Sequence, residues 1–142
     1  MNIKDLIPQR DPFLFVSFFE RNDDQSLTTS FTFKETQDFF QGHFPGNPIV
    51  PGVILSEHCF QSAAALIALT SDSPQQKSLA VLSRIQSAKF KSIVRPGETI
   101  TTKTICTERM GPAAFFKSII QNQQNKKVLI IEYSCTLIEE EV

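Results

Sequence analysis

The chain has no tryptophan, a single tyrosine, two histidines and only three cysteines among its 142 residues. The cysteines, Cys59, Cys106 and Cys135, are odd in number, widely spaced and form no C-x-x-C pair. A disulfide framework and a cysteine-based metal site both need paired cysteines, so neither is expected. We expect three free and mostly buried thiols, as in a protein of the reducing cytoplasm.

The sequence also lacks an excess of charge of either sign. Fourteen Lys and Arg residues against fifteen Asp and Glu residues give a net charge of −1 at pH 7. Without a basic surplus the chain is not expected to bind nucleic acid, because phosphates would stay unneutralised. The first residues carry an acid at Asp5 in place of the apolar stretch of a secretory signal, and no long run of consecutive apolar residues predicts a membrane span. We therefore expect a cytoplasmic protein outside the membrane.

Three motifs of well-known enzyme classes are missing. The sequence contains no G-x-S-x-G, no G-x-x-x-x-G-K-S/T and no G-x-G-x-x-G. Serine hydrolase, P-loop and dinucleotide-binding functions therefore have no support. A length of 142 residues suits one domain covering 1–142, with room for a sizeable core, and no repeat or linker suggests a second domain.

Hydrophobic patterning predicts an α+β chain with about six strands and one long helix. The helix is expected over 53–69, and apolar residues surround most of its circumference, so it should be buried. Two strands, one helix and four more strands do not alternate as β-α-β units, which favours an antiparallel sheet wrapped around the helix. The predicted strands cover 13–19, 27–33, 78–90, 99–107, 113–121 and 128–138.

A carboxylate, Glu57, interrupts the apolar helix. Leaving even a neutral polar group unpaired in an apolar interior costs about 2–7 kcal/mol, so this side chain is either used or paired. Gln61 lies one helical turn further on, where it can hydrogen-bond the carboxylate and fix its rotamer. The simpler interpretation is that Glu57 caps a helix end or meets water at a subunit boundary.

An imidazole, His43, precedes Glu57 by fourteen residues in a loop with three prolines. Prolines reduce the entropy cost of holding a side chain in place, so the two groups are a plausible acid–base pair. Gly52, at the helix start, offers a free backbone N–H that could polarise a carbonyl group. A solvent-exposed histidine and an ordinary helix-start glycine are the simpler alternatives. His58 would point about 100° away from Glu57 around the helix and is interpreted as structural.

At these residues the chain resembles the 3-hydroxyacyl-(acyl carrier protein) dehydratases of the hot-dog fold. The resemblance rests on Glu57, Gln61 and three motifs: H-F-P-G-N-P-I-V-P-G, I-P-Q-R-D-P-F-L-F-V and A-K-F-K-S-I-V-R-P-G-E. It implies an antiparallel sheet around a central helix and a homodimer in which each active site takes His43 from one subunit and Glu57 from the other. It also implies further assembly as a trimer of dimers.

The resemblance further implies a role for each site residue. His43 would remove the C2 proton of a 3-hydroxyacyl thioester, Glu57 would position or protonate the leaving C3 hydroxyl, and the Gly52 N–H would hold the thioester oxygen. The product would be a trans-2-enoyl thioester, made without metal or redox cofactor on the phosphopantetheine of acyl carrier protein. The chain departs from the family at Asn47 and Ala65, which suits polyene or polyketide-like lipid synthesis as well as fatty-acid synthesis.

Three cations, Lys89, Lys91 and Arg95, follow the helix and could steer an acidic carrier protein to the site. Solvated charges at a strand edge explain them equally well. Two other functions stay open for the whole chain. A hot-dog acyl-thioesterase would use Glu57 to activate water without His43, and a non-catalytic acyl-binding subunit would keep the fold without the chemistry.

Overall fold

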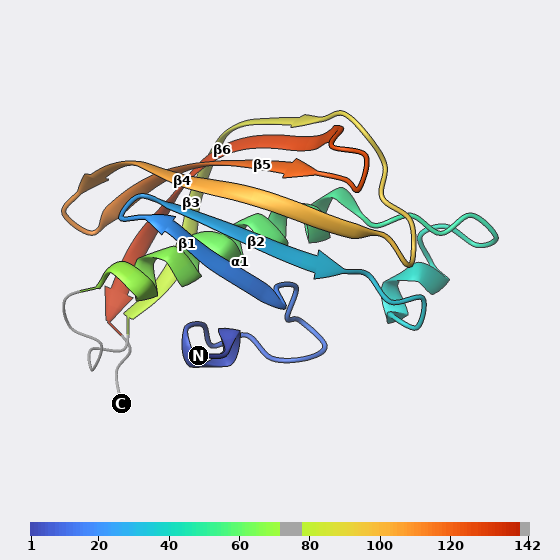
Figure 1. Cartoon of the computed structure of the whole chain (residues 1–142), viewed down its shortest axis with the longest axis horizontal. Helices are drawn as coiled ribbons and strands as arrows, with labels where there is room; N and C mark the ends of the chain where they lie inside the picture. Colours follow the sequence, from blue (N-terminus) through green and yellow to red (C-terminus); the bar gives the residue numbers. More distant parts are fainter. Residues whose placement is uncertain (72–77, 140–142) are drawn as a thin grey trace.

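The computed structural model describes residues 1–71 and 78–139. Strand β1 precedes β2, the 3-10 helix η2 and the long helix α1, and four further strands follow α1 (Figure 1). The described elements are η1 (Ile3–Asp5), β1 (Phe18–Asp23), β2 (Ser26–Thr32), η2 (Asp38–Gln41), α1 (Gly52–Thr70), β3 (Ser78–Phe90), β4 (Thr99–Met110), β5 (Ala113–Gln121) and β6 (Lys127–Glu139).

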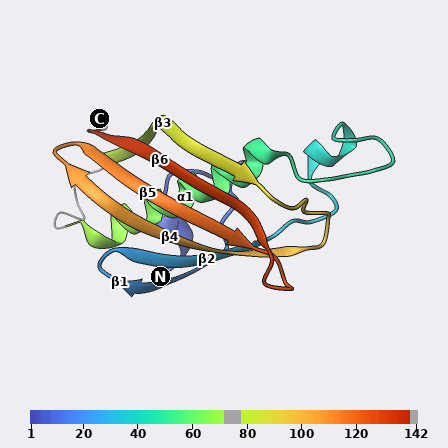
Figure 2. The ribbon, with the colours of Figure 1, turned by 90° about the horizontal axis from the view of Figure 1, so that it is seen from above.

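The strands form one antiparallel sheet in the order β1-β2-β4-β5-β6-β3. The sheet curls around α1, which lies along its concave face (Figures 1 and 2). The chain leaves the sheet after β2, passes through α1, and returns at the opposite edge as β3, which pairs with β6. The predicted α+β architecture, an antiparallel sheet wrapped around one helix, is therefore confirmed.

The core lies between α1 and the concave face of the sheet. Along β5 every second residue is buried, as expected for a strand with one face on a core. Burying each large apolar side chain contributes about 1.5–3 kcal/mol, so this contact supplies much of the stability. Fully buried side chains from the sheet include Leu27, Ile100, Phe116, Ile120 and Ile131, and those from the helix include Leu55, Cys59, Ala63, Ala65 and Leu66.

Buried hydroxyl groups also join the helix to the sheet. The Tyr133 hydroxyl donates to the Cys59 carbonyl oxygen at 2.8 Å and lies 2.8 Å from the Ser118 hydroxyl, which in turn lies 2.7 Å from the Thr104 hydroxyl. Because each of these polar groups has a partner, their burial is tolerated. The three cysteines are free, with Cys59 and Cys135 buried and Cys106 half-buried, as predicted.

Helix α1 is long and apolar enough, by length and composition alone, to cross a membrane. In the structure 56% of its most apolar window is buried inside the protein, under the sheet. An apolar helix enclosed in this way is the core helix of the domain, and its composition follows from burial on most sides.

The first strand differs from the prediction. A strand was expected over 13–19 with a turn at 20–24, but β1 begins at Phe18 and the turn falls at Asp24 and Gln25. The reason lies at Phe15, whose backbone N–H and carbonyl bind side chains of α1 and not a neighbouring strand. The remaining strands match to within a few residues, β4 and β6 being slightly longer than predicted. The predicted polar closure of the helix over 70–77 lies mostly outside the described residues.

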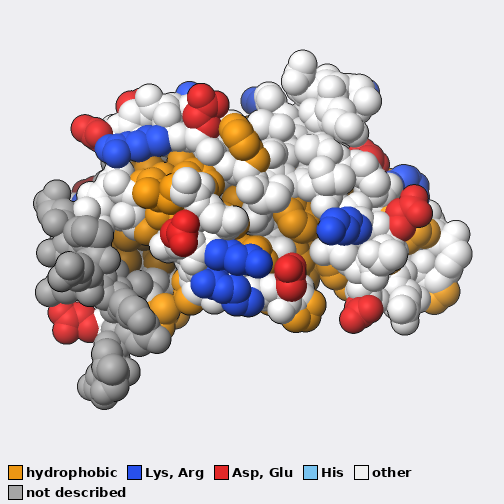
Figure 3. Space-filling model, turned by 60° about the horizontal axis from the view of Figure 1, so that its bottom comes forward, with side chains coloured by type: hydrophobic (Ala, Val, Ile, Leu, Met, Phe, Trp, Pro, Cys, Tyr) orange, Lys and Arg blue, Asp and Glu red, His pale blue; other side chains and the backbone are white. Residues whose placement is uncertain are grey.

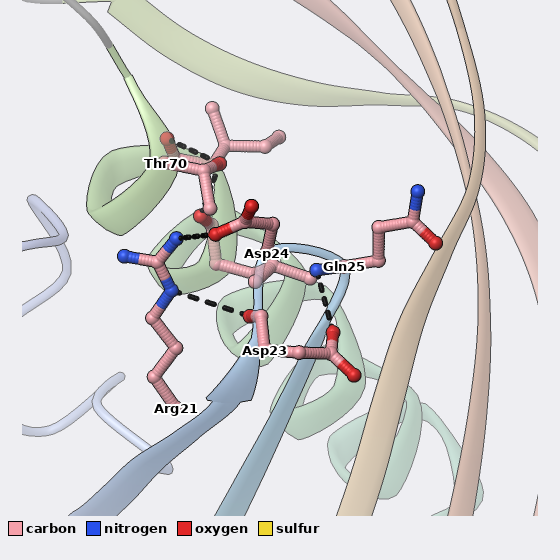
Figure 4. Close-up of polar contacts among 7 residues, drawn as sticks. Arg21, Asp23, Asp24, Gln25 and Thr70 are labelled. Carbon is pink, nitrogen blue, oxygen red and sulfur yellow. Dashed lines mark hydrogen bonds and ion pairs between the residues drawn. The ribbon is translucent and has the colours of Figure 1, made fainter.

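The turn between β1 and β2 lies beside the C-terminal end of α1 (Figure 4). Arg21 donates to the Asp23 carbonyl oxygen at 3.2 Å and forms an ion pair with Asp24, and the Gln25 N–H donates to the Asp23 carboxylate at 2.7 Å. These local contacts are those of an Asx-type turn, which explains why the hairpin reverses here and not at the earlier residues.

Candidate active site

His43 lies in the loop between η2 and α1. Its Nδ1 atom lies 3.1 Å from the Ile49 carbonyl oxygen, and its ring stacks on Phe44 with centroids 4.1 Å apart. Because a carbonyl oxygen only accepts hydrogen bonds, Nδ1 carries the proton and Nε2 keeps a lone pair. The side chain is half-buried, so the free Nε2 can reach a ligand and accept a proton.

The loop carrying His43 is tied to the segment after β3. The Val50 N–H donates to the Val94 carbonyl oxygen at 2.8 Å, and the Arg95 guanidinium donates to the Asn47 side-chain oxygen at 2.8 Å. Within the loop, the Asn47 N–H donates to the Phe44 carbonyl oxygen at 2.9 Å. These bonds hold the imidazole in a defined position, which is what a catalytic base requires.

Glu57 lies in the second turn of α1, on the stripe of the helix that the sheet leaves open. The side chain is half-buried and not fully buried, while Val53, one turn earlier, is 75% exposed. Partial burial raises the pKa of the Glu57 carboxyl above its ordinary value, and a hydrogen bond donated by Gln61 opposes the rise. A carboxyl group with a raised pKa keeps its proton to a higher pH than an exposed carboxyl group does.

Gln61 makes the predicted contact with Glu57. Its Nε2 atom donates to the Glu57 carboxylate at 3.0 Å and to the Phe13 carbonyl oxygen at 2.9 Å, and its Oε1 atom accepts from the Phe15 N–H at 2.8 Å. Every hydrogen-bonding direction of the amide is thus used except one acceptor lone pair, so the orientation of the side chain is fixed.

His58, interpreted from the sequence as structural, is completely buried with both ring nitrogens bonded. Nδ1 lies 2.6 Å from the Phe15 carbonyl oxygen and Nε2 lies 2.7 Å from the Thr102 hydroxyl. Burial lowers the pKa of His58 to about 4, so the ring is neutral at pH 7. The sequence did not predict that His58 and Gln61 both form hydrogen bonds with the backbone of 13–15. The available signal was two further polar residues close together in an apolar helix.

Gly52 is the first residue of α1, and the close approach of Phe90 explains the glycine. A Cβ atom there would lie 3.0 Å from a ring carbon of Phe90, closer than side chains normally approach. Among the described residues no group accepts from the Gly52 N–H, which belongs to the unpaired first turn of the helix.

Among the described residues, His43 and Glu57 have separate hydrogen-bond partners, Ile49 and Gln61, and no hydrogen bond joins the two side chains. Lys89, Lys91 and Arg95 are exposed around the end of β3. No cluster of three or more His, Cys, Asp or Glu side chains is placed to hold a metal ion within 1–71 and 78–139.

A recess of about 550 Å³ lies at the opposite end of α1, beside the β1–β2 turn (Figure 4), and none of the predicted site residues lines it. Its lining comes from Arg21, Asp24, Gln25, Leu66, Ile67, Thr70, Cys106, Thr107, Glu108, Arg109 and Phe116.

Strand β3 forms an edge of the sheet with apolar side chains in solvent. Its ladder partner among the described strands is β6, so its other edge has no strand beside it. The exposed apolar side chains of β3 are Val81, Leu82, Ile85 and Phe90, each 39–53% exposed. Elsewhere too, apolar side chains reach the surface between charged ones, as the face in Figure 3 shows. An open edge with such residues is a typical pairing surface.

An antiparallel sheet wrapped around one helix is the hot-dog fold, a class to which dehydratases and thioesterases belong. The structure titled "The Dehydratase Heterocomplex ApeI:P from Xenorhabdus doucetiae" superposes with a TM-score of 0.82 at 10% identity, covering 97% of this chain and 91% of that one. A hypothetical thioesterase from Streptococcus pneumoniae with coenzyme A superposes with a TM-score of 0.64 at 13% identity, covering 88% of each chain. These likenesses establish the fold.

The family is established by sequence. The model of the ApeI-like family, described as ApeI dehydratase, matches residues 20–129, and the chain belongs to this dehydratase family. The 3-hydroxyacyl-(acyl carrier protein) dehydratase FabZ of Lactobacillus helveticus is 43% identical over 99 residues, 69% of this chain and 66% of that protein. FabZ of Chlamydia trachomatis is 33% identical over 126 residues, 86% of this chain and 82% of that protein. The family predicted from the sequence is thereby confirmed.

Replacing Glu57 tests whether its burial is costly. Because the native pKa of Glu57 lies above its unfolded value, the folded state binds the proton more tightly, and stability is lost as pH rises through the interval between the two values. Glu57→Gln should therefore match the wild type at about pH 4 and be more stable at pH 8. Urea denaturation at both pH values measures the difference, with Glu20→Gln, at an exposed position, as control. A variant less stable than the wild type at pH 8 would contradict this account.

Proposed function

We propose that the chain is a 3-hydroxyacyl-(acyl carrier protein) dehydratase, converting (3R)-3-hydroxyacyl thioesters to trans-2-enoyl thioesters in fatty-acid or related polyene or polyketide lipid synthesis. The carrying observation is a free imidazole nitrogen and a carboxyl of raised pKa, each held by a hydrogen bond, in a chain of a dehydratase family. The proposal treats 1–142 as a single cytoplasmic domain that uses no metal or redox cofactor. The substrate is carried on phosphopantetheine.

The proposed reaction assigns one step to each group. His43 Nε2 takes the C2 proton, and the electron pair moves toward the thioester carbonyl, whose oxygen is stabilised by the Gly52 N–H. Glu57 gives its proton to the C3 hydroxyl, the C3–O bond breaks and water leaves. The imidazolium then loses its proton and the carboxylate regains one through solvent, which restores the enzyme. Gln61 supports the reaction by holding the carboxyl in place.

We propose that two copies of the chain complete the site. Support comes from the open edge of β3 and from the exposed apolar side chains on that strand. Pairing of β3 with its symmetry mate would make a continuous sheet and bury the apolar side chains. Each site would then take His43 from one subunit and Glu57 from the other. Assembly of three such dimers is a further part of the proposal, resting on the family resemblance. The heterocomplex named for the Xenorhabdus structure makes a second, different dehydratase subunit the alternative partner.

We further propose acyl carrier protein as the partner that delivers the substrate. The FabZ relatives are named for acyl-carrier-protein substrates. Lys89, Lys91 and Arg95 are exposed, and Arg95 bonds Asn47 in the loop of His43. Cations at this position would attract an acidic carrier toward the imidazole.

Two other functions are distinguished by product. A thioesterase would release free thiol and acid, and a non-catalytic acyl-binding subunit would bind thioesters without turnover. The hydrogen-bonded carboxyl of raised pKa favours the dehydratase over a pure binding protein, because such a subunit has no use for a partly buried acid.

Hydration of a 2-enoyl thioester tests the proposed reaction in reverse. The wild type should remove the conjugated absorbance of crotonyl or longer enoyl thioesters without releasing thiol. His43→Ala and Glu57→Gln should each lose about 10²- to 10⁴-fold in kcat, because each removes a group that transfers a proton. Thiol release would indicate a thioesterase, and absence of turnover on carrier and coenzyme A thioesters would indicate a binding subunit.

Complementation tests the shared site. Co-refolded His43→Ala and Glu57→Ala chains should recover up to about a quarter of wild-type activity, since half of randomly formed dimers are mixed and each holds one intact site of two. Each variant refolded alone serves as control. Mixed dimers that form but stay inactive would contradict the assignment of His43 and Glu57 to different subunits.

Charge reversal tests carrier docking. The double variant Lys89→Glu and Lys91→Glu should raise KM for a carrier-bound substrate by about tenfold at low salt and leave KM for a short thioester analogue unchanged. Lys103→Glu, at an exposed position on β4, is the matched control. Equal changes in KM for both substrates would contradict the docking proposal.

A further inference from the structure

A chain of hydrogen bonds runs from the sheet to Glu57 through the buried face of α1. Thr102 of β4 contacts His58, His58 contacts the Phe15 carbonyl, the Phe15 N–H contacts Gln61, and Gln61 contacts Glu57. The four distances lie between 2.6 and 3.0 Å. His58 and Gln61 are both fully buried. The proposed reaction leaves this histidine unused, although its burial requires a hydrogen-bond partner for each ring nitrogen.

The hydrogen-bond directions along this chain are determined by the acceptors. The Phe15 carbonyl accepts, so His58 Nδ1 carries the proton, and the neutral ring accepts from the Thr102 hydroxyl at Nε2. The Phe15 N–H donates, so the oxygen of Gln61 faces it, and the amide nitrogen must face Glu57. If the amide of Gln61 rotated by half a turn, three hydrogen bonds would be lost at once.

The backbone at Phe15 depends on these two side chains. Residues 13–17 lie outside the strands, and both backbone groups of Phe15 are satisfied by α1, through residues three positions apart in the helix. Without His58 the carbonyl of Phe15 would lose its partner, and Gln61 would be left to hold the segment to α1, through the Phe15 N–H and the Phe13 carbonyl. Gln61 would then follow a looser segment, and its bond to Glu57 would lose its fixed direction.

Few other groups act on Glu57. Among the described residues, Gln61 on α1 donates the hydrogen bond that lowers its pKa, and Cys135 on β6 lies close enough to be affected by its charge. Burial, followed by the Glu57 charge, raises the pKa of Cys135 to about 11, so this thiol stays neutral near pH 7. The Gln61 amide is therefore the hydrogen-bond donor that opposes the effect of burial on the pKa of the carboxyl.

We propose that His58 is a positioning residue of the active site: it fixes the backbone at Phe15 so that Gln61 holds Glu57 in its reactive orientation. This inference rests on the function proposed for Glu57. It assigns to His58 no contact with substrate and no proton transfer, only control of the geometry and ionisation of the carboxyl through two intermediate groups.

Four variants separate positioning from folding. His58→Asn places its amide nitrogen where Nδ1 was and keeps the bond to Phe15. His58→Gln reaches toward Thr102 and loses that bond, while His58→Ala loses both. Ser62→Ala is the matched control, because Ser62 joins the same helix to the same sheet through Thr29 at 2.8 Å without contacting 13–15.

The first measurement is the titration of the Glu57 carboxyl group, which ¹³C NMR monitors in the full chain. The Glu57→Gln variant identifies the Glu57 carboxyl resonance. The pKa of Glu57 should rise in His58→Ala and His58→Gln, where the Gln61 bond is weakened, and stay at the wild-type value in His58→Asn and Ser62→Ala. The second readout is turnover of an enoyl thioester. His58→Ala and His58→Gln should lose about 10- to 100-fold in kcat, while KM changes less than about twofold. Such a loss is typical of a misplaced catalytic group.

The inference is overturned if the pKa of Glu57 is the same in all variants. It is also overturned if kcat falls in proportion to the melting temperature, by the same relation in the His58 variants and in Ser62→Ala. If His58→Ala does not fold, the comparison of His58→Asn with His58→Gln decides. If the wild type turns over no thioester, the proposed function fails, and the titration alone still decides whether His58 controls Glu57.

Discussion

The sheet removes water from most of helix α1, and every polar group on the enclosed faces must therefore find a partner within the protein. Leaving one such group unpaired costs about 1–3 kcal/mol, a large share of the stability of a small domain. His58, Gln61 and Ser62 meet this requirement through Thr102, the backbone at Phe13 and Phe15, and Thr29. These bonds fix the rotation of α1 relative to the sheet more sharply than its apolar residues do, because apolar side chains surround most of the helix.

The same requirement defines the chemistry at Glu57. This residue lies at the border between the enclosed and the open faces of α1, where it is buried enough to raise its pKa and still partly exposed. Gln61, one turn further on, connects the two faces, since its amide binds both the enclosed backbone and the carboxyl group proposed as the acid. The polar residues that hold the fold thus also set the properties of the acid.

Features that depend on residues close together in the sequence could be predicted, and features that depend on distant residues could not. Helix α1 and strands β3 to β6 were predicted because side-chain periodicity is local, and the Gln61–Glu57 bond was predicted because residues four apart share a helix face. The segment 13–17 was predicted wrongly as a strand. Its composition favours one, but its partners, His58 and Gln61, lie more than forty residues away in the sequence. The contacts of His58 with Phe15 and Thr102 were missed for the same reason, and the pairing of His43 with Glu57 stays a prediction based on family resemblance.

The route from β3 to the site gives the proposed dimer a consequence for activity. Phe90, the last residue of β3, lies against Gly52, and the next residues carry Val94 and Arg95, which bind the loop of His43. In the proposed dimer, a partner strand on β3 would therefore restrain both the imidazole loop and the helix start of the same chain. Since the edge strand and the anchoring segment are continuous, assembly would order the elements of the site as well as bring His43 and Glu57 together. A lone chain would lack the second catalytic group and this restraint, so catalysis in this architecture is expected to depend on the dimer.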